Sequence, residues 1–353
     1  MDNVNIPLFS NKTTIGYQTE SENEIVGKDT IFSPGNLENV TLSGNGKRVA
    51  FSRRDVTNPG GSSDAIGPSE YNVILYQLNS NNNWSKYGEI AITDKNSKAA
   101  MISYNYDGTL LIVTYGQTQI VGYTEHNYFV KKDTHNFIEF RATHVNTNKY
   151  GDRIIVSYSN SNKVYEYVSN NWSLIGSEIT DPNNTSDFFF SHLNDKGDIF
   201  VTIGTNSSNV YYLSVYKYDV PQDSWFKLGS DILSSTSNSS YIDSISISSL
   251  GYTVAYTAND ITEIYTYNGS EWVMKGNQIS NTHTKNIINK EDDAYISLLY
   301  RNNVYFYAYN KLSNTWYQES SFQGDSISIS VNYDSSIIAS IKADYNLNDP
   351  FSI

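Results

Sequence analysis

All five tryptophans of this chain lie in copies of one short motif, in which tryptophan precedes a glycine by four residues and then an isoleucine. The copy at Trp172 reads "WSLIGSEI", whereas the copy at Trp316, "WYQESSF", lacks the glycine. The last four tryptophans follow at intervals of 53, 47 and 44 residues, and the first two are 88 residues apart, with a tyrosine at the midpoint. Aromatic residues therefore mark six units whose length is typical of a four-stranded propeller blade. The six markers are Trp84, Tyr128, Trp172, Trp225, Trp272 and Trp316.

Each unit also contains a turn that leads into a β-branched run, as in "SGNGKRVAFS" at 43–52 and "NYDGTLLIVT" at 105–114. Glycine, asparagine or aspartate in such a turn supplies the positive φ that tight hairpins require. Before the turn, apolar residues alternate with a small polar residue, which predicts a strand with unlike faces. These polar residues include Thr41, Ser103, Ser246 and Ser330. The other five turns begin at 148, 194, 248, 289 and 332.

A Val- and Tyr-rich run precedes the tryptophans, for example "NKVYEYV" before Trp172, and its composition favours a further strand. Each unit is thus predicted to contain an inner strand, a turn, a second strand, a loop, the Tyr-rich strand and a Trp-marked outermost strand. The seventh turn is followed by only half a unit, whereas residues 12–31 contain an unmatched half. We therefore expect the two ends of the chain to pair in one blade.

These patterns predict an all-β fold, a seven-bladed β-propeller with four antiparallel strands in each blade. The ring is expected to be closed by N-terminal strands that complete the C-terminal blade. Residues 1–353 are predicted to form this single domain. Its blades are expected at about 38–90, 91–134, 135–179, 180–232, 233–279, 280–322, and 323–345 together with 12–31.

The repeated tryptophan is expected to pack against the neighbouring strand or blade, because burying such a ring removes roughly 200 Å² from water. The glycine four residues later is expected to permit a bulge or a close backbone contact. A ligand cage built from the same rings is the alternative, but aromatic stripes on repeated strands are more often core.

The bulk composition limits the partners and the chemistry. The formal net charge is −13, which argues against nucleic acid and against anionic membrane surfaces as partners. The chain has no cysteine, which excludes disulfides, zinc–thiolate sites and thiol catalysis. Neither a signal peptide nor a membrane-spanning apolar run is visible, so we expect a soluble protein, cytoplasmic or virion-associated.

The composite of "VTLSGNGKRVAFS" and "YNVILYQLNSNNNWSKYGEI" resembles the FG-GAP, or integrin-α-like, propeller repeats found in large DNA viruses and marine microbes. The resemblance covers nearly the whole chain and is clearest at 38–90, 141–179 and 241–279. It implies a propeller and, through its viral members, a structural or virion-associated role. The calcium-binding branch of that class carries Asp-x-Asp-x-Asp-Gly loops, and this sequence has none, so no metal site is carried over.

Catalytic motifs are absent from the sequence. It contains no nucleophile elbow, no phosphate-binding glycine loop and no paired carboxylates on the inner strands. We therefore expect no enzyme and no cofactor. His144 and His192 lie in two successive innermost strands and are predicted to face the central channel, either as a funnel site or as polar residues that line a wet channel.

One segment breaks the repeat. An insertion at 53–70, "RRDVTNPGGSSDAIGPSE", separates the second and third strands of the first blade. Surface loops on a rigid scaffold commonly carry binding function, although a tolerated insertion is an equally simple interpretation. The charged candidates for partner binding are Arg53, Arg54, Asp55, Asp64 and Glu70.

The leading hypothesis is a non-catalytic scaffold for protein–protein interaction, a viral structural or virion-associated protein whose partners include capsid or other virion components. The alternative is a lectin-like propeller that binds glycans in Tyr- or Asn-rich pockets between blades. A third hypothesis is a hydrolase with a channel site near His144 and His192, which would require carboxylates that converge in the channel mouth.

Overall fold

The chain is described by a computed structural model, and every element among the described residues is a β-strand. The described residues are 13–18, 29–32, 36–55, 70–80, 84–92, 101–115, 119–126, 128–131, 142, 144–158, 161–169, 171–180, 190–205, 208, 210–233, 242–280, 285–289, 294–300, 303–322, 326–333 and 337–342.

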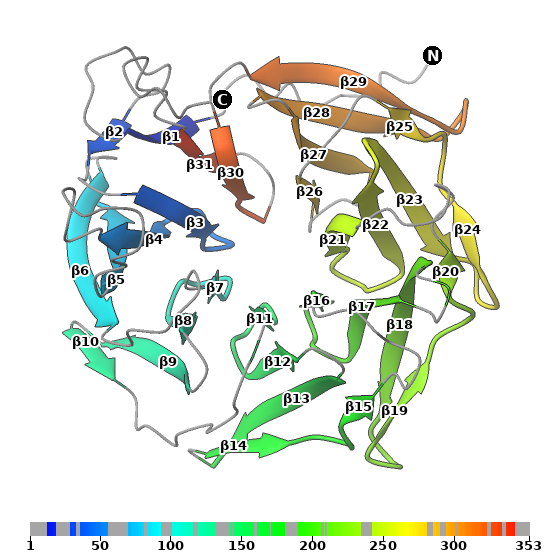
Figure 1. The fold of residues 1–353 in the computed structure, drawn as a ribbon, viewed down its shortest axis with the longest axis horizontal. Coiled ribbons are helices and arrows are strands. Elements are labelled where there is room, and N and C mark those ends of the chain that lie inside the picture. Colours follow the sequence, from blue (N-terminus) through cyan, green and yellow to red (C-terminus); the bar gives the residue numbers. More distant parts are fainter. Residues whose placement is uncertain are drawn as a thin grey trace.

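The described strands form seven sheets, each with four strands in a row. Figure 1 shows these sheets around a common centre, with the first strand of each sheet nearest to it. From the centre outwards, the first sheet contains β3 (Asn36–Leu42), β4 (Arg48–Asp55), β5 (Glu70–Leu78) and β6 (Trp84–Ile92). The second contains β7 (Met101–Tyr104), β8 (Leu110–Tyr115), β9 (Gln119–His126) and β10 (Tyr128–Lys131). The third contains β11 (His144–Thr147), β12 (Arg153–Ser157), β13 (Ser161–Val168) and β14 (Asn171–Leu174).

The next three sheets repeat this order. They contain β16 (Ser191–Leu193), β17 (Ile199–Thr205), β18 (Tyr211–Asp219) and β19 (Ser224–Lys227); β21 (Ile242–Ile247), β22 (Thr253–Ala258), β23 (Ile261–Tyr267) and β24 (Trp272–Met274); and β26 (Lys285–Ile288), β27 (Tyr295–Tyr300), β28 (Asn303–Asn310) and β29 (Thr315–Phe322). Three short strands pair with the third strand of their sheets, and each begins at the isoleucine of the tryptophan motif. They are β15 (Ile179–Thr180), β20 (Ile232–Leu233) and β25 (Ile279–Ser280).

The remaining sheet combines both ends of the chain. It contains β30 (Ser326–Val331), β31 (Ile337–Lys342), β1 (Thr13–Gln18) and β2 (Asp29–Phe32). β1 pairs with β31 in parallel, with Thr13 opposite Ile337, and β2 pairs in parallel with β1. The prediction of antiparallel strands throughout is therefore wrong for this sheet. No short turn connects β31 to β1, so the connectivity does not impose the antiparallel direction that a hairpin would.

Hydrophobic clusters fill the space between neighbouring sheets. One cluster joins Val201 and Leu213 with Val254 and Tyr256 from the next sheet. Another joins strands of the first sheet to Ala339 of β31. The second strands of the blades thus bury both faces, as in β17 and β22, whose residues are all buried, and this explains their apolar runs. The predicted all-β propeller of four-stranded blades is confirmed.

The tryptophans mark outermost strands, as predicted, and three of them donate an indole hydrogen bond to the preceding blade. Trp272 Nε1 donates a hydrogen bond to the Leu228 carbonyl at 2.7 Å, and Trp316 Nε1 donates to the Lys275 carbonyl at 2.6 Å. Trp225 repeats the pattern on the Ile175 carbonyl at 3.0 Å. The residue after each of these carbonyls is the glycine of the motif, so the predicted close backbone contact is confirmed.

Five of the predicted turns between first and second strands are described in full; they are confirmed and share one hydrogen-bonding pattern. The side chain of the first turn residue accepts a bond from the backbone N–H five residues later, as from Asn194 Oδ1 to Ile199 N at 3.0 Å. The fourth turn residue is a glycine with positive φ in five of the described turns. These glycines are Gly46, Gly108, Gly151, Gly197 and Gly251. Local sequence therefore sets the shape of each turn.

Candidate functional site

Backbone hydrogen bonds link the turns of neighbouring blades around the axis. Tyr106 N donates to the Lys149 carbonyl at 2.9 Å, and Lys149 N donates to the Asp195 carbonyl at 3.2 Å. Asp195 N donates to the Ser249 carbonyl at 3.1 Å, and Tyr333 N donates to the Gly44 carbonyl at 2.8 Å. These residues all hold the second position of their turns. We call them the turn ring: Gly44, Tyr106, Lys149, Asp195, Ser249 and Tyr333.

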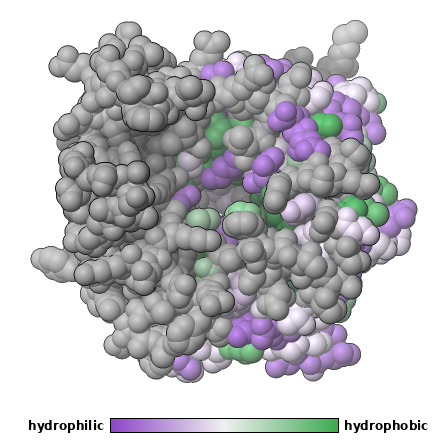
Figure 2. All heavy atoms as spheres, viewed as in Figure 1, coloured by the Kyte–Doolittle hydropathy of each residue, from purple (hydrophilic) through white to green (hydrophobic). Residues whose placement is uncertain are grey.

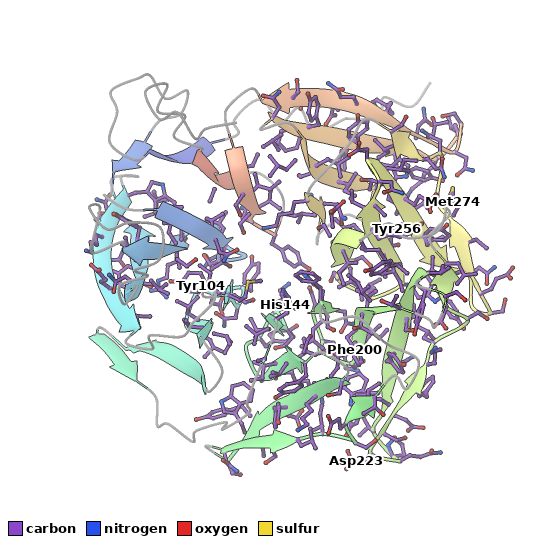
Figure 3. All side chains as sticks on the ribbon, viewed as in Figure 1. Tyr104, His144, Phe200, Asp223, Tyr256 and Met274 are labelled. Carbon is purple, nitrogen blue, oxygen red and sulfur yellow. The ribbon has the colours of Figure 1, made fainter. Side chains whose placement is uncertain are left out.

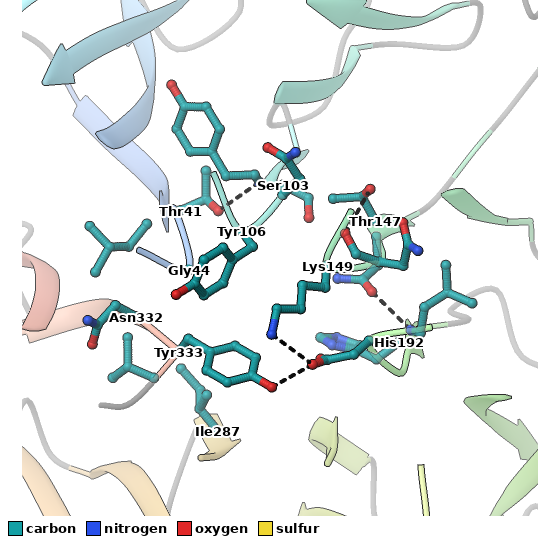
Figure 4. A pocket seen from close by; sticks show the side chains of 18 of the residues that line it. Thr41, Gly44, Ser103, Tyr106, Thr147, Lys149, His192, Ile287, Asn332 and Tyr333 are labelled. Atoms are coloured by element: carbon teal, nitrogen blue, oxygen red, sulfur yellow. Dashed lines mark hydrogen bonds and ion pairs between the residues drawn. The ribbon is translucent and has the colours of Figure 1, made fainter. Parts of the chain in front are cut away.

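Side chains of the turn ring meet across the axis (Figure 4). Tyr333 OH donates a hydrogen bond to Asp195 Oδ2 at 2.6 Å, and Ser249 Oγ donates to the same oxygen at 2.7 Å. Lys149 Nζ lies 3.8 Å from that oxygen. The ammonium also lies 4.1 Å from the centre of the Tyr333 ring and 4.8 Å from the centre of the Tyr106 ring. The carboxylate and two aromatic faces together hold one cation.

Electrostatics follow from this packing. Burial alone would lower the pKa of Lys149, but the phenol of Tyr333 and the charge of Asp195 outweigh it and raise the pKa. Burial and the hydrogen bond to Asp195 raise the pKa of Tyr333. Lys149 therefore stays charged and Tyr333 stays neutral at physiological pH. Neither group is set up as a general base near pH 7.

A glycine in the turn ring makes room for one of the aromatic rings. A Cβ on Gly44 would lie 2.9 Å from Tyr106 Cα, which is too close for any side chain. The first blade therefore contributes only backbone at this position, and Tyr106 occupies the freed space.

The innermost strands form a second layer of polar side chains. Thr41 Oγ1 accepts a hydrogen bond from Tyr104 N at 3.2 Å, and Ser330 Oγ accepts one from Leu42 N at 3.0 Å. Ser246 Oγ accepts from Ile288 N at 3.1 Å. Each bond connects one innermost strand to the next, so the alternating polar residues seen in the sequence serve blade-to-blade pairing.

A cavity of about 190 Å³ lies on the axis between these two layers. Its lining includes residues from six blades, among them Thr41, Ser103, Asn146, His192, Ile287 and Tyr333. Asp195 is the only carboxylate among the described lining residues, and Lys149 is the only ammonium. Such a lining offers hydrogen bonds to a small polar guest but no pair of carboxylates.

The structure brings the two predicted channel histidines together. The rings of His144 and His192 stack with their centres 5.2 Å apart, and His192 lines the cavity. His144 is only 7 % exposed, and Phe190 contacts its ring edge-on at 5.4 Å. Figure 3 shows His144 close to the centre of the ring of blades. His192 therefore lines the cavity and His144 is buried beside it, and the role of the two histidines as a channel site stays a prediction.

Sequence reasoning missed two elements of this site. The first is the turn ring, although its members share one place, directly after the Asn or Ser that begins each turn. The second is Lys285, whose charge lowers the pKa of His144 and which precedes Asn289 by four residues just as His144 precedes Asn148. Aligning the repeats on the first residue of each turn would have identified both the turn ring and the position shared by His144 and Lys285.

The predicted partner-binding loop is shorter than expected. Arg53, Arg54 and Asp55 belong to β4, and Glu70 opens β5, where it pairs with Asp55. The hairpin therefore extends into both ends of the predicted insertion, because its ladder continues as long as the two strands stay side by side. Asp64 lies outside the described residues, and the role of all five residues stays a prediction.

Two further absences apply to the described part of the chain. Within it, no group of three or more histidine, aspartate or glutamate side chains is placed to hold a metal ion. Across the same residues, the structure contains no helix with the length and apolarity needed to cross a membrane.

Comparison with known proteins identifies the fold and no family. No family model and no curated protein matches the chain. Among solved structures, the chain is similar to one titled as the structure of U3-55K, with TM-score 0.56 and 10% identity, covering 85% of this chain and 86% of that chain. It is also similar to a chain of the mitotic checkpoint complex, with TM-score 0.59 and 12% identity, covering 92% and 93%. A functionally unknown protein from Desulfotomaculum acetoxidans DSM 771 matches with TM-score 0.58 and 9% identity, covering 89% and 92%.

These likenesses support the β-propeller and carry no shared activity at such low identity. The resemblance to FG-GAP and integrin-α-like repeats stays a prediction, as does the viral or virion-associated role.

Proposed function

We propose that the protein is a non-catalytic scaffold that binds a partner protein, built as a seven-bladed ring closed by the N-terminal strands. The observation that carries the proposal is a contrast between two regions. Polar side chains around the axis bond to neighbouring blades, whereas large apolar side chains stand exposed on the outer surface. Because the axial polar groups bond to neighbouring blades, we assign them a structural role and not a catalytic one. The exposed apolar side chains favour a role in binding a partner protein.

Closure of the ring is supported at the seam between the first and last blades. Tyr333 N donates to the Gly44 carbonyl, and Ser330 Oγ accepts from Leu42 N. β1 extends the last sheet beside β31. The same kinds of bond connect neighbouring blades elsewhere, so the seam is built like the other junctions.

The surface that we propose for partner binding is the turn face. In a sheet of antiparallel hairpins, the turn between the first two strands and the turn between the last two lie at the same end. On that end Tyr150 is 66 % exposed, Val220 67 % and Leu250 72 %. Val168 and Leu312 are also exposed there. We define the turn face by these five residues. In Figure 2, which shows one side of the molecule, the coloured residues include both hydrophobic and hydrophilic ones.

Aromatic and aliphatic side chains of this size are the usual anchors of protein interfaces. Exposed in a ring of turns, they would give a partner several contacts on a rigid frame. A chain of similar fold occurs in the mitotic checkpoint complex, so this fold is compatible with a role in a protein assembly.

The test compares the turn face with a matched set of exposed apolar residues on the outer strands. One variant carries Tyr150→Ser, Val220→Ser and Leu250→Ser, and the control carries Leu174→Ser and Phe226→Ser. Tagged forms of both are recovered from the native source and their stoichiometric partners are identified by mass spectrometry. We expect the turn-face variant to lose a partner that the wild type and the control retain.

Two other outcomes would contradict this assignment. Loss of the partner only after changes at Arg53, Arg54 or Glu70 would place binding at the predicted insertion. Recovery of the wild type as a free monomer would overturn the scaffold, and a glycan array would then test the lectin alternative.

A further inference from the structure

The innermost strands share a polar position two residues before each turn, and Ser103 departs from the bonding pattern of that position. Ser330 Oγ and Thr41 Oγ1 each accept a backbone N–H from the next blade, at 3.0 and 3.2 Å. Asn146 Oδ1 and Ser246 Oγ do the same at 2.9 and 3.1 Å. Within the described part of the chain, the Ser103 hydroxyl makes neither this bond nor any other hydrogen bond. Its donor and its acceptor capacity are therefore both unused.

The Ser103 hydroxyl is buried and lies at the axial cavity. The residue is 8 % exposed, and it belongs to the lining of the cavity of about 190 Å³ (Figure 4). An unsatisfied buried polar group costs roughly 1–3 kcal/mol, and such groups normally bond to water or to a bound molecule. The cavity thus has a polar group that calls for a partner inside it.

Three further lining residues have unused hydrogen-bonding atoms. Thr41 accepts a bond, but its O–H proton has no acceptor among the described residues, and the Nδ2 of Asn146 has none either. Asp195 binds the hydroxyls of Tyr333 and Ser249 through Oδ2 alone, so its Oδ1 keeps its acceptor capacity within the described structure. The lining therefore offers several donors and at least one acceptor to a guest.

The opposite side of the cavity is apolar. Ile287 of the sixth blade and Val331 of the seventh line it. In Figure 4, Ile287 lies on the far side of the Tyr333 ring from Thr41 and Ser103. A guest that fills this space would turn hydroxyl groups to one wall and C–H groups to the other.

The charges of the lining favour a neutral guest. The Lys149 ammonium lies 3.8 Å from the Asp195 carboxylate, and both residues line the cavity. A guest with a net charge of either sign would therefore meet one opposite charge and one like charge, and the two effects oppose each other.

We propose that the axial cavity binds a small neutral polyol of the size of a monosaccharide or a cyclitol. Thr41, Ser103 and Asn146 donate to its hydroxyl oxygens, and Asp195 Oδ1 accepts from one of its hydroxyls. Because a cavity of about 150 Å³ can hold one benzene ring, a volume of about 190 Å³ admits a six-membered ring. This site is separate from the turn face and from the pockets between blades that the lectin alternative requires.

The experiment is calorimetric titration of the full chain with D-glucose and with myo-inositol, supported by saturation-transfer NMR of the two polyols. Ser103→Ala removes one hydrogen bond to the guest and none within the described structure. We expect it to weaken binding by about threefold to tenfold without changing the stability of the protein. Ser103→Leu should abolish binding by filling the cavity, and circular dichroism verifies that this variant is folded.

Ser246→Ala is the matched control, because Ser246 holds the same position in the fifth blade, which contributes no described residue to the lining. This variant loses the bond to Ile288 N, so it should be less stable than the wild type and bind the polyol equally well. A purely structural role of the serine position would instead give Ser103→Ala the same loss of stability and no change in affinity.

Charged analogues test the chemical class of the guest. D-glucuronate and protonated D-glucosamine should bind more weakly than D-glucose. Tighter binding of either analogue would contradict recognition of a neutral polyol. Failure of both D-glucose and myo-inositol to bind the wild type would overturn the proposal, and so would equal affinity of the wild type and Ser103→Leu.

Discussion

His144 shows how a single residue can make the stability of the whole chain depend on pH. Its ring lies between His192 and Phe190, away from water and facing the charge of Lys285. The folded protein therefore disfavours the imidazolium form, and the pKa of His144 falls from its usual value of 6.5 to about 4. Between those two values the unfolded chain binds a proton that the folded chain does not.

Stability should accordingly be lost as pH falls through this window. Between pH 7 and pH 5, we expect the free energy of unfolding to drop by about 2 kcal/mol more in the wild type than in His144→Phe. Denaturant titrations at the two pH values measure the difference. Phe190→Leu is the control, because it alters the packing around His144 and keeps the titrating group. Equal pH dependence in the wild type and His144→Phe would show that the pKa of the histidine is not depressed.

At the scale of elements, the outermost strands are joined through a tryptophan on one blade and a glycine on the blade before it. Trp316 donates to the Lys275 carbonyl, and its ring covers Gly276. A cross-strand ring contact supports the indole from its own blade, where the centre of the Tyr309 ring lies 5.2 Å away. The tryptophan of each motif thus packs on the preceding blade, and the glycine of the motif receives the tryptophan of the following blade.

The need for glycine beneath the indole can be tested by adding one methyl group. A Cβ on Gly276 would lie 2.7 Å from Trp316 Cδ1, and the backbone has φ +81. We expect Gly276→Ala to lower the free energy of unfolding by about 1–3 kcal/mol, through strain and displacement of the indole. Gly269→Ala is the matched control, because Gly269 also has positive φ, but a Cβ there would meet no atom within 4 Å. Equal losses in chemical denaturation would mean that backbone conformation alone sets the cost.

At the scale of the whole molecule, the turn ring connects blades that are far apart in sequence. Tyr333 of the last blade reaches Asp195 and Ser249, which belong to two successive blades near the middle of the chain. Lys149, which belongs to yet another blade, forms an ion pair with the Asp195 carboxylate. The axis is therefore held by contacts that no single blade could make.

A double-mutant cycle should reveal that coupling. Tyr333→Phe removes the donor of a 2.6 Å hydrogen bond, and Asp195→Asn removes the charge of its acceptor. We expect their effects on the free energy of unfolding to be non-additive by about 1–2 kcal/mol, as for hydrogen bonds to charged groups. Tyr333→Phe combined with Asp198→Asn is the control, because Asp198 bonds to Lys196 and Asn194 instead. Additive effects of the first pair would contradict an energetic coupling across the axis.

Much of this architecture could be predicted from local patterns. The tryptophan motif located the outermost strands, and the Asn- or Ser-led turns located the innermost hairpins. Alternation at Thr41 and Ser330 predicted a strand with unlike faces. These features could be read directly because each depends on residues within a few positions of one another, and the repeat presented each one several times.

The remaining features depended on which blades meet in space. Local sequence did not reveal that Trp272 would rest on the glycine of the preceding blade, or that the charge of Lys285 would act on His144. It also did not reveal the parallel pairing of β1 with β31, because no short turn ties those strands together. The repeat in the sequence determined what each blade is, and only the tertiary structure decided which atoms of different blades touch, because the same local pattern recurs in every blade and does not specify the contacts between blades.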